Sequence, residues 1–193
     1  MDIDKIIHNR RSTFTSQFSG ELIDDAIIHH LLENANWAPS HYQTEPWRFK
    51  IYSGKSLNRM LDTLANIYKV KTSVDVFSQA KFDKYSLRKN QISHAIVIIV
   101  NKSNRPDLQD VEEICATACA VQNLWLTVAS IPDIGGYWST GKLVFTKEFS
   151  EFNGLKENQQ CLGLFYLGKI KDGSKKIVGV RKNWQEKVEF FKD

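Results

Sequence analysis

Apolar residues recur at helical spacing along several parts of the chain, and each recurrence predicts a helix. The clearest helix begins after Asp24, a suitable N-cap, and must stop shortly before Pro39. Its apolar face comprises Ile27, Ile28, Leu31, Leu32 and Ala35. Similar spacing predicts a short helix over residues 2–9 and an amphipathic helix around residues 57–64.

The longest predicted helix runs from about residue 111 to residue 130, with Asp110 as its cap. Apolar residues occupy nearly its whole circumference, so it should be buried on most sides, either in its own core or against a partner subunit. Cys115 and Cys119 lie one helical turn apart on it. Because no second pair or suitably spaced histidine completes a metal site, we expect both to be small buried residues and expect no metal.

Three segments predict strands. Residues 47–52 alternate bulky and charged side chains, as a half-buried strand does, whereas residues 96–100 and 161–167 are apolar runs that suit core strands. Residues 69–92 are polar and predict only partial helix, and residues 184–191 predict a docked C-terminal tail. Helices and strands do not alternate regularly, so the sequence favours the α+β class.

The composition is close to the globular average, with 193 residues of which 42% are hydrophobic and 25% charged. These values favour one domain over residues 1–193 and argue against disorder, collagen and coiled coil. The longest uniformly apolar run has six residues, and the N-terminus lacks a signal-peptide pattern. Three cysteines are too few for a disulfide scaffold. We therefore expect a cytoplasmic protein without membrane contact.

The net charge of +4 is concentrated in one segment. Between Lys69 and Lys89 there are six basic and two acidic residues, an excess that equals the excess of the whole chain. Such a segment is most often a solvated face, and it can also attract a phosphorylated small molecule or nucleic acid. No aromatic residues are interleaved at regular spacing for stacking on bases, so we set nucleic acid aside.

The sequence excludes several familiar catalytic motifs. Residues 136–142 have the spacing of a phosphate loop, but Leu143 stands where a serine or threonine should bind magnesium, and a helix precedes the segment where a strand is required. No G-x-G-x-x-G, G-x-S-x-G or H-E-x-x-H occurs. These absences argue against a Rossmann dinucleotide domain, an α/β-hydrolase and a zincin.

Two other segments are stronger candidates for chemistry. Arg10-Arg11-Ser12 offers two fixed cations and a hydroxyl, which are groups that grip a phosphate, although the same residues also suit a basic surface turn. Residues 37–47 form an aromatic, amide-bearing loop whose path two prolines fix. Its polar side chains can hydrogen-bond the edge of a heterocycle, although such a loop can also be purely structural.

Taken in order, these segments resemble the FMN-dependent nitroreductase family. Arg10-Arg11-Ser12 corresponds to the family's opening R-R-S. Residues 38–47 (A-P-S-H-Y-Q-T-E-P-W) match its A-P-S-x-x-N-x-Q-P-W in length and in the fixed positions. Residues 120–124 fit its central dimer helix, and residues 135–141 (G-G-Y-W-S-T-G) fit the segment that follows.

The resemblance extends from about residue 3 to residue 191. Residues 162–168 are similar to the family's closing strand, and Arg181 to its late basic residue that reaches the phosphate. The short length and His41 are most like the small single-domain branch that includes the YdjA-type NAD(P)H nitroreductases. The implied fold is a central, mostly antiparallel sheet flanked by helices, with a long central dimer helix.

The resemblance also implies a site. In such proteins the flavin carries the chemistry, so no catalytic side chain is expected. The implied cofactor-binding residues are Arg10, Arg11, Ser12, Trp37, Ser40, His41, Gln43, Gly136, Trp138, Ser139, Thr140 and Arg181. Among these, Arg10, Ser12 and Arg181 would hold the FMN phosphate and ribityl chain, with Arg11 nearby. The 40–43 loop would come from the other subunit, and residues 138–140 would line the isoalloxazine or ribityl side.

The implied activity is the reduction of a small organic acceptor, such as a nitroaromatic or a quinone, by NAD(P)H through FMN in a homodimer, with ping-pong kinetics. Phe14, Gln43 and Glu45 depart from the family's usual arginine, asparagine and glutamine, and they bear on the flavin-edge contacts and the substrate range. Two alternatives stay open. One is a flavin carrier or redox sensor without turnover, which Glu45 favours, and the other is a domain that shares only the fold.

Overall fold

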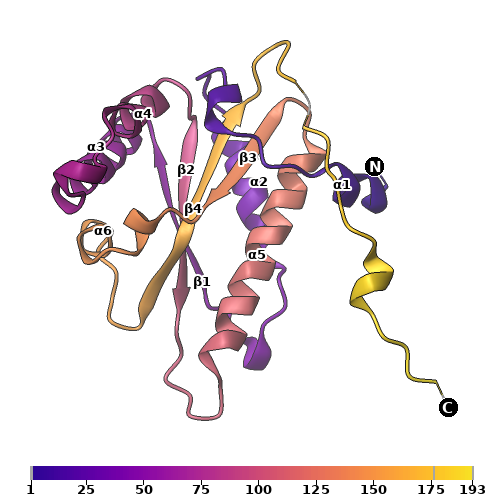
Figure 1. The fold of residues 1–193 in the computed structure, drawn as a ribbon. Coiled ribbons are helices and arrows are strands. Elements are labelled where there is room, and N and C mark those ends of the chain that lie inside the picture. Colours follow the sequence, from indigo (N-terminus) through magenta and orange to yellow (C-terminus); the bar gives the residue numbers. More distant parts are fainter. Residues whose placement is uncertain (1, 176, 193) are drawn as a thin grey trace.

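The computed structural model describes residues 2–175 and 177–192 (Figure 1). Its helices are α1 (Ile3–Asn9), α2 (Asp25–Asn36), α3 (Gly54–Lys71), α4 (Gln79–Lys89), α5 (Asp110–Ser130) and α6 (Lys147–Phe152). Its strands are β1 (Trp47–Ser53), β2 (His94–Asn101), β3 (Ile134–Ser139) and β4 (Gln159–Lys169). Short 3-10 turns are η1 (Thr15–Gln17), η2 (His41–Gln43), η3 (Val74–Val76), η4 (Lys142–Phe145) and η5 (Trp184–Lys187). Within the described ranges, no helix combines the length and the apolar character that crossing a membrane requires.

The strands form one antiparallel sheet in the order β1-β2-β4-β3. In its registers, His94 of β2 lies opposite Leu167 of β4, and Ile134 of β3 lies opposite Lys169. The two middle strands are buried almost throughout, because both faces of the sheet are covered. The α+β class and the mostly antiparallel sheet flanked by helices are therefore confirmed.

Alternate residues of the middle strands feed two apolar cores. Helices α3, α4 and α6 lie on one face of the sheet, and α2 and α5 lie on the other (Figure 1). Val97 and Ile99 of β2 pack with α3 on the first face, whereas Ile96 and Ile98 pack with α2 and α5 on the second. Burial of these side chains supplies the main stabilisation of the fold.

Most elements agree with the sequence prediction, including the helices at residues 2–9 and after Asp24, whose carboxylate accepts the Ala26 N–H at 2.8 Å. The cap predicted for α5 is wrong. Asp110 is already helical and pairs with Lys102, while Glu112 accepts the Gln109 N–H at 2.9 Å. The polar segment 69–92 is more ordered than predicted, since it contains the end of α3 and the whole of α4.

Strand β3 was not predicted from the sequence. Its two glycines hid the strand from the pattern, and they also allow it to pack closely in the fold. Gly135 and Gly136 have low intrinsic strand propensity, so the pattern indicated a flexible connection. In the fold, a Cβ atom on Gly135 would lie 2.6 Å from the Cβ of Thr13, and one on Gly136 would lie 2.5 Å from the ring of Phe165. The absence of side chains therefore lets β3 pack closely against its neighbours.

One face of α5 is left uncovered, which contradicts one sequence prediction. Ala120, Val121 and Leu124 pack against the sheet, but the opposite face is exposed. Cys115 and Cys119 lie on that exposed face, so the prediction that they are buried is wrong for a single chain. A straight helix that packs on a sheet buries the side that faces the sheet, and an apolar composition of the opposite side does not bury that side as well.

The C-terminal segment also differs from its prediction. Residues 184–191 were expected to dock, but the yellow segment in Figure 1 leaves the body of the molecule. Trp184 is 59% exposed, Phe190 71% and Phe191 91%. The expectation of docking on the same chain is therefore wrong, and the segment presents apolar side chains to solvent.

Candidate functional site

The segment that carries the arginines runs along the free edge of β3. The Thr13 N–H donates to the Gly136 carbonyl oxygen at 3.0 Å, which fixes the segment beside the strand. The close approach at Gly135 permits this contact. Phe14 then lies against Tyr137, with ring centroids 5.1 Å apart. The sequence thus places Arg10 to Phe14 along the outermost strand of the sheet.

Arg10, Arg11 and Arg181 form what we call the arginine cluster. The Arg10 guanidinium lies 4.2 Å from the centre of the Trp125 ring. Burial lowers the pKa of Arg10, and the charges of Arg181 and Arg11 lower it further. Nη1 of Arg10 and Nε of Arg11 are buried and find no acceptor among the described residues. Three cations gathered with unsatisfied N–H donors are suited to bind an anion.

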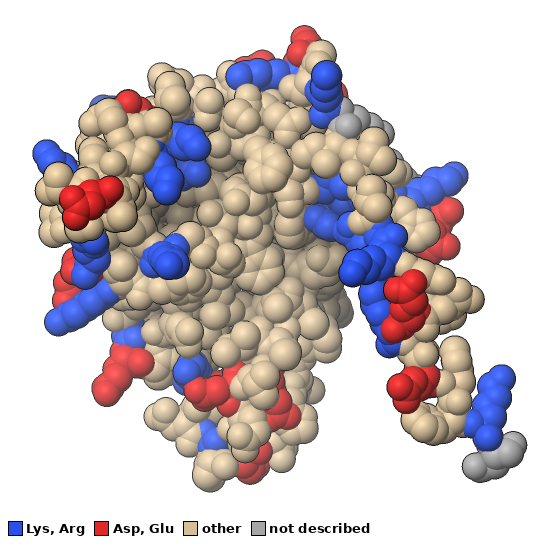
Figure 2. Space-filling view, in the orientation of Figure 1, with Lys and Arg blue, Asp and Glu red and all other residues tan. Residues whose placement is uncertain are grey.

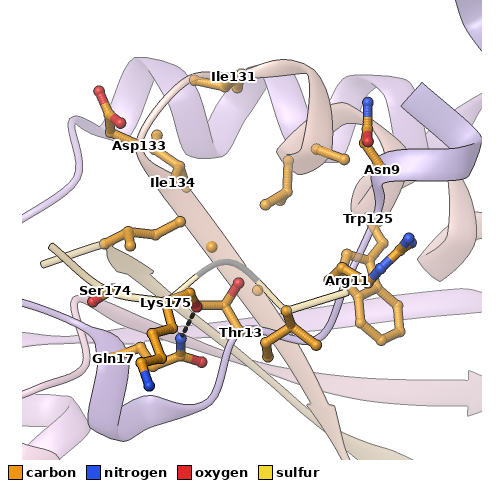
Figure 3. A pocket seen from close by; sticks show the side chains of 16 residues that line it. Asn9, Arg11, Thr13, Gln17, Trp125, Ile131, Asp133, Ile134, Ser174 and Lys175 are labelled. Carbon is orange, nitrogen blue, oxygen red and sulfur yellow. Dashed lines mark hydrogen bonds between the residues drawn. The ribbon is translucent and has the colours of Figure 1, made fainter. Parts of the chain in front are cut away.

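Arg11 is held differently from Arg10. Its Nη1 donates to the Arg10 carbonyl oxygen at 2.7 Å, and its guanidinium lies so close to Gly179 that a Cβ there would clash with it. Arg11 also lines a cavity of about 470 Å³ behind β3. Figure 3 shows Arg11, Trp125 and Thr13 around this cavity, with Gln17 donating to the Lys175 carbonyl oxygen at 3.1 Å. Arg11 therefore connects the cluster to the C-terminal segment.

The 37–47 loop is a strained, exposed structure. Tyr42, Gln43 and Glu45 have positive φ angles of 51°, 53° and 42°, which non-glycine residues rarely adopt. The Ser40 hydroxyl accepts the Glu45 N–H at 3.2 Å and holds the loop together. Backbone strain of this kind is concentrated at functional sites, where the surrounding structure maintains it.

The polar side chains of this loop face solvent. His41 and Gln43 are exposed, Ser40 is half-buried, and Trp37 is 82% exposed. Within a single chain, the Trp37 ring and the polar side chains of this loop are therefore accessible to a ligand or a partner.

Within one chain the loop and the arginine cluster lie at opposite ends of α5 (Figure 1). Tyr42 stacks under Arg105, which precedes the helix, with 4.2 Å between guanidinium carbon and ring centre. Arg10 lies on Trp125, fifteen residues after Asp110, which corresponds to about 22 Å along the helix axis. Of the predicted residues, the structure brings Arg10, Arg11 and Arg181 together and places Arg11 and Gly136 at one cavity. The 37–43 loop lies apart from them.

The predicted residues after the glycine pair have three different environments. Trp138 is half-buried on the α5 side of the sheet, and its Nε1–H donates to the Leu162 carbonyl oxygen at 3.2 Å. Ser139 lines a large cavity on the opposite side of the sheet. Thr140 is exposed. Of the three, Ser139 borders a large cavity, whereas Trp138 packs on the α5 side of the sheet within a single chain.

The cavity at Ser139 was missed by the sequence analysis. It measures about 720 Å³, lies between α3, α4 and η4, and we call it the basic cavity. Its defining residues are Tyr68, Lys71, Lys81, Lys84, Tyr85, Arg88, Ser139, Lys142 and Tyr166. The available signal was the excess of basic residues between Lys69 and Lys89, but the sequence did not indicate which other segments face it.

Aromatic rings connect the basic cavity to the arginine segment. Tyr137 contacts Phe14 and also stacks on Tyr166, with ring centroids 6.4 Å apart. Tyr166 is fully buried, and burial raises its pKa to about 12. The Arg88 guanidinium lies 5.2 Å from the centre of the Tyr166 ring. A chain of aromatic contacts therefore links Phe14, in the segment that follows the arginines, to Tyr166 beside the basic cavity.

Comparisons with known proteins identify the family of this chain. The Nitroreductase family profile matches residues 7–169. A Bacillus subtilis protein named "Putative NAD(P)H nitroreductase YfhC" is 28% identical over 163 residues, which cover 84% of this chain and 81% of that protein. The structure is similar to that of a nitroreductase-like family protein from Bacillus cereus, with a TM-score of 0.82, 26% identity and coverage of 100% of this chain and 97% of that one.

A more distant similarity shows the fold alone. The FMN-dependent nitroreductase NfnB from Mycobacterium smegmatis, solved in complex with NADPH, aligns with a TM-score of 0.75 and 15% identity. The alignment covers 98% of this chain and 97% of that one. The family resemblance expected from the sequence is confirmed by the profile match. The chain belongs to the nitroreductase family, a family of oxidoreductases.

Proposed function

We propose that this protein binds FMN and uses NAD(P)H to reduce a small organic acceptor, such as a nitroaromatic or a quinone, by two electrons. The observation that carries the proposal is the arginine cluster, whose buried N–H donors lack an acceptor among the described residues. The name of the Bacillus subtilis relative and the NADPH complex of the Mycobacterium smegmatis protein support this choice of cofactor and donor.

The residues present fit FMN. Its phosphate is an anion that Arg10, Ser12 and Arg181 would hold, and Arg11 would keep the segment in place through its bond to the Arg10 carbonyl. Between the cluster and the basic cavity, Phe14, Tyr137 and Ser139 offer a surface for a flat ring system. Bound FMN would supply the hydride and two-electron chemistry, so the chain needs no nucleophile or acid–base pair of its own.

A second copy of the chain would complete the site. The 37–43 loop and the arginine cluster lie at opposite ends of α5, and the face of α5 around Cys115 and Cys119 is exposed. If two copies pair through this face with their α5 helices antiparallel, the loop of one copy reaches the cluster of the other. The apolar C-terminal segment around Trp184 would then have a surface to cover. We therefore propose a homodimer.

Donor and acceptor would use the same position in turn. The sequence has no dinucleotide-binding motif, so the nicotinamide would be held mainly by stacking on the exposed flavin face. The acceptor would enter only after the oxidised donor leaves. Such shared occupancy gives ping-pong kinetics, with parallel lines when both substrates are varied.

An anaerobic titration tests the proposal. Purified protein reconstituted with FMN should show flavin absorbance, lose it on addition of NADH or NADPH, and regain it when a nitroaromatic or a quinone is added. A flavin that binds but is not bleached would instead support a carrier or sensor without turnover. A protein that retains no FMN would contradict the proposal at its first step.

A further inference from the structure

We propose that the basic cavity recognises a flat aromatic anion, so that the preferred acceptors carry a carboxylate or a phosphate on the ring that bears the reducible group. This inference rests on the proposed function, because it names the class of acceptor used at that site. It depends on three features of the cavity, namely its charge, its aromatic walls and its position along β3.

The charge of the cavity is one-sided. Five of its lining residues are cations (Lys71, Lys81, Lys84, Arg88 and Lys142), and no carboxylate belongs to the lining. Lys71 is already paired with Glu148 at 2.8 Å. Lys81, Lys84 and Lys142 form no ion pair with any carboxylate of the described chain. In Figure 2, Lys and Arg side chains lie on the helix side of the hollow between the α3–α4 pair and the sheet.

This one-sided charge favours an anion inside the cavity. Walls of low dielectric constant concentrate the field of the cations and raise the local concentration of a negative ligand. A purely solvated basic face, the more common interpretation of the segment between Lys69 and Lys89, does not require these side chains to converge on a cavity. Here Lys81 and Lys84 come from α4 and Lys142 from η4, on two different sides of the cavity.

The remaining walls favour a flat ring. Tyr68, Tyr85 and Tyr166 all line the cavity, and Tyr68 stacks on Phe77 with ring centroids 5.3 Å apart. Arg88 lies over both Tyr85 and Tyr166, at 5.5 Å and 5.2 Å from their ring centres. These contacts hold the charge of Arg88 against the aromatic wall of the cavity. An aromatic body with a charged substituent matches this combination better than an aliphatic anion does.

The position of the cavity connects it to the reaction. Ser139 is shared between β3 and the cavity lining, and Tyr137 stacks on Tyr166 at the base of the cavity. A ligand in the cavity would therefore lie beside the surface on which the flavin ring is proposed to rest. For a nitroaromatic, one hydride from NAD(P)H and one proton convert the nitro group to a nitroso group and release water, so the charged substituent stays unchanged and serves only for recognition.

The experiment compares 4-nitrobenzoate with 4-nitrobenzamide, which have similar shapes and differ in charge. The test variant is Lys81→Gln/Lys84→Gln, and the matched control is Lys55→Gln/Lys69→Gln, which removes two exposed lysines of α3 outside the cavity lining. One charge at contact distance contributes about 1 kcal/mol in water, which corresponds to about fivefold. Because the test variant removes two such charges, we expect its ratio of kcat/KM for 4-nitrobenzoate over 4-nitrobenzamide to fall by about 5- to 25-fold. The ratio should stay unchanged in the control.

Calorimetric titration with 4-nitrobenzoate and 4-nitrobenzamide (below, benzoate and benzamide), in the absence of NAD(P)H, gives a second readout that needs no turnover. Benzoate should bind the FMN-loaded protein more tightly than benzamide, and the test variant should lose this difference. The preference should also shrink in high salt, since exposed charges are screened. Equal kcat/KM and equal binding for the two compounds in the unmodified protein would overturn the inference while leaving the proposed function intact.

Two further outcomes distinguish a failure of the proposed function from a different role of the lysines. If neither nitro compound is reduced and NADPH does not bleach the flavin, the proposed function fails, whereas selective benzoate binding that the test variant loses would still support the cavity as an anion site. If the test variant slows only anaerobic flavin reduction by NADPH and leaves the benzoate preference unchanged, the lysines bind the phosphates of the donor. That result would overturn the assignment to the acceptor.

Discussion

Replacing Arg10 by glutamine separates the phosphate contact of FMN from every other contact that the cofactor makes. FMN and riboflavin share the ring and the ribityl chain and differ only in the phosphate. If Arg10 holds the phosphate, Arg10→Gln should weaken FMN binding strongly and riboflavin binding little. The ratio of the two dissociation constants is therefore the informative quantity, because it cancels any change that affects both ligands.

The structure sets the size of the effect. A hydrogen bond to a charged group contributes about 1.5–3 kcal/mol, which corresponds to a change of roughly 10- to 100-fold in affinity. The neighbouring charges of Arg11 and Arg181 lower the pKa of Arg10, so removing its charge relieves some repulsion in the empty site. Arg10 is also half-buried rather than fully buried. Both features favour the lower end of this range, so we expect Arg10→Gln to weaken FMN binding by about tenfold to thirtyfold.

Loss of the contact between Arg10 and Trp125 should cost about 0.5–1 kcal/mol of stability, and it should affect both ligands alike. The assay is fluorescence titration of the protein with FMN and with riboflavin at fixed ionic strength. Arg59→Gln, which removes an exposed arginine of α3, is the matched control and should change neither constant. Equal losses for FMN and riboflavin in Arg10→Gln would refute the assignment of this residue to the phosphate.

Three other predictions concern stability and assembly. Burial lowers the pKa of His94 from 6.5 although Asp25 lies nearby, so the unfolded chain takes up the proton first and the free energy of unfolding should decrease as the pH falls below about 6.5. In urea titrations, His94→Gln should weaken this pH dependence, and an unchanged dependence would argue against a role of His94. Gly136→Ala places a methyl group against Phe165 and should cost about 1–3 kcal/mol of thermal stability, unlike Gly141→Ala, whose Cβ would meet only the Ser139 hydroxyl, at 3.9 Å; equal losses would be inconsistent with the close packing of β3. Cys119→Lys puts a charge on the exposed face of α5 and should shift the mass in light scattering from dimer to monomer, whereas an unchanged mass would place the interface elsewhere.

Local patterns predicted most of the fold. The helix after Asp24 was predictable because its cap, apolar face and terminating proline lie within one stretch of sequence. Strand β3 was not predictable in this way, since its stability comes from pairing with β4, more than twenty residues later, and from the close approach of Thr13. The exposure of Cys119 was missed for a related reason, because composition alone does not show which side of a helix meets the sheet.

The candidate site was predictable in part. Arg10 and Ser12 could be identified from a short motif, and the structure places this segment beside Gly136 of β3. The basic cavity could not be located, because its cations come from residues 71–88 and 142, whereas Tyr166 lies on a strand that follows later in the chain. Charge counts show that a segment is basic, but only the packing of α4 on α3, with η4 at the other side of the same cavity, shows that its cations converge.

Subunit complementation tests most directly the claim that two copies of this chain form a reducing FMN site. One variant carries Arg10→Gln and the other carries His41→Ala/Gln43→Ala, and each alone should reduce poorly when FMN is limiting. In a mixed dimer, the copy with an intact arginine cluster meets the intact loop of the other copy, so one of the two sites is complete. Random mixing should then restore about one quarter of the NADPH-dependent flavin bleaching of the unmodified protein. Mixtures no more active than the separate variants would contradict the shared site.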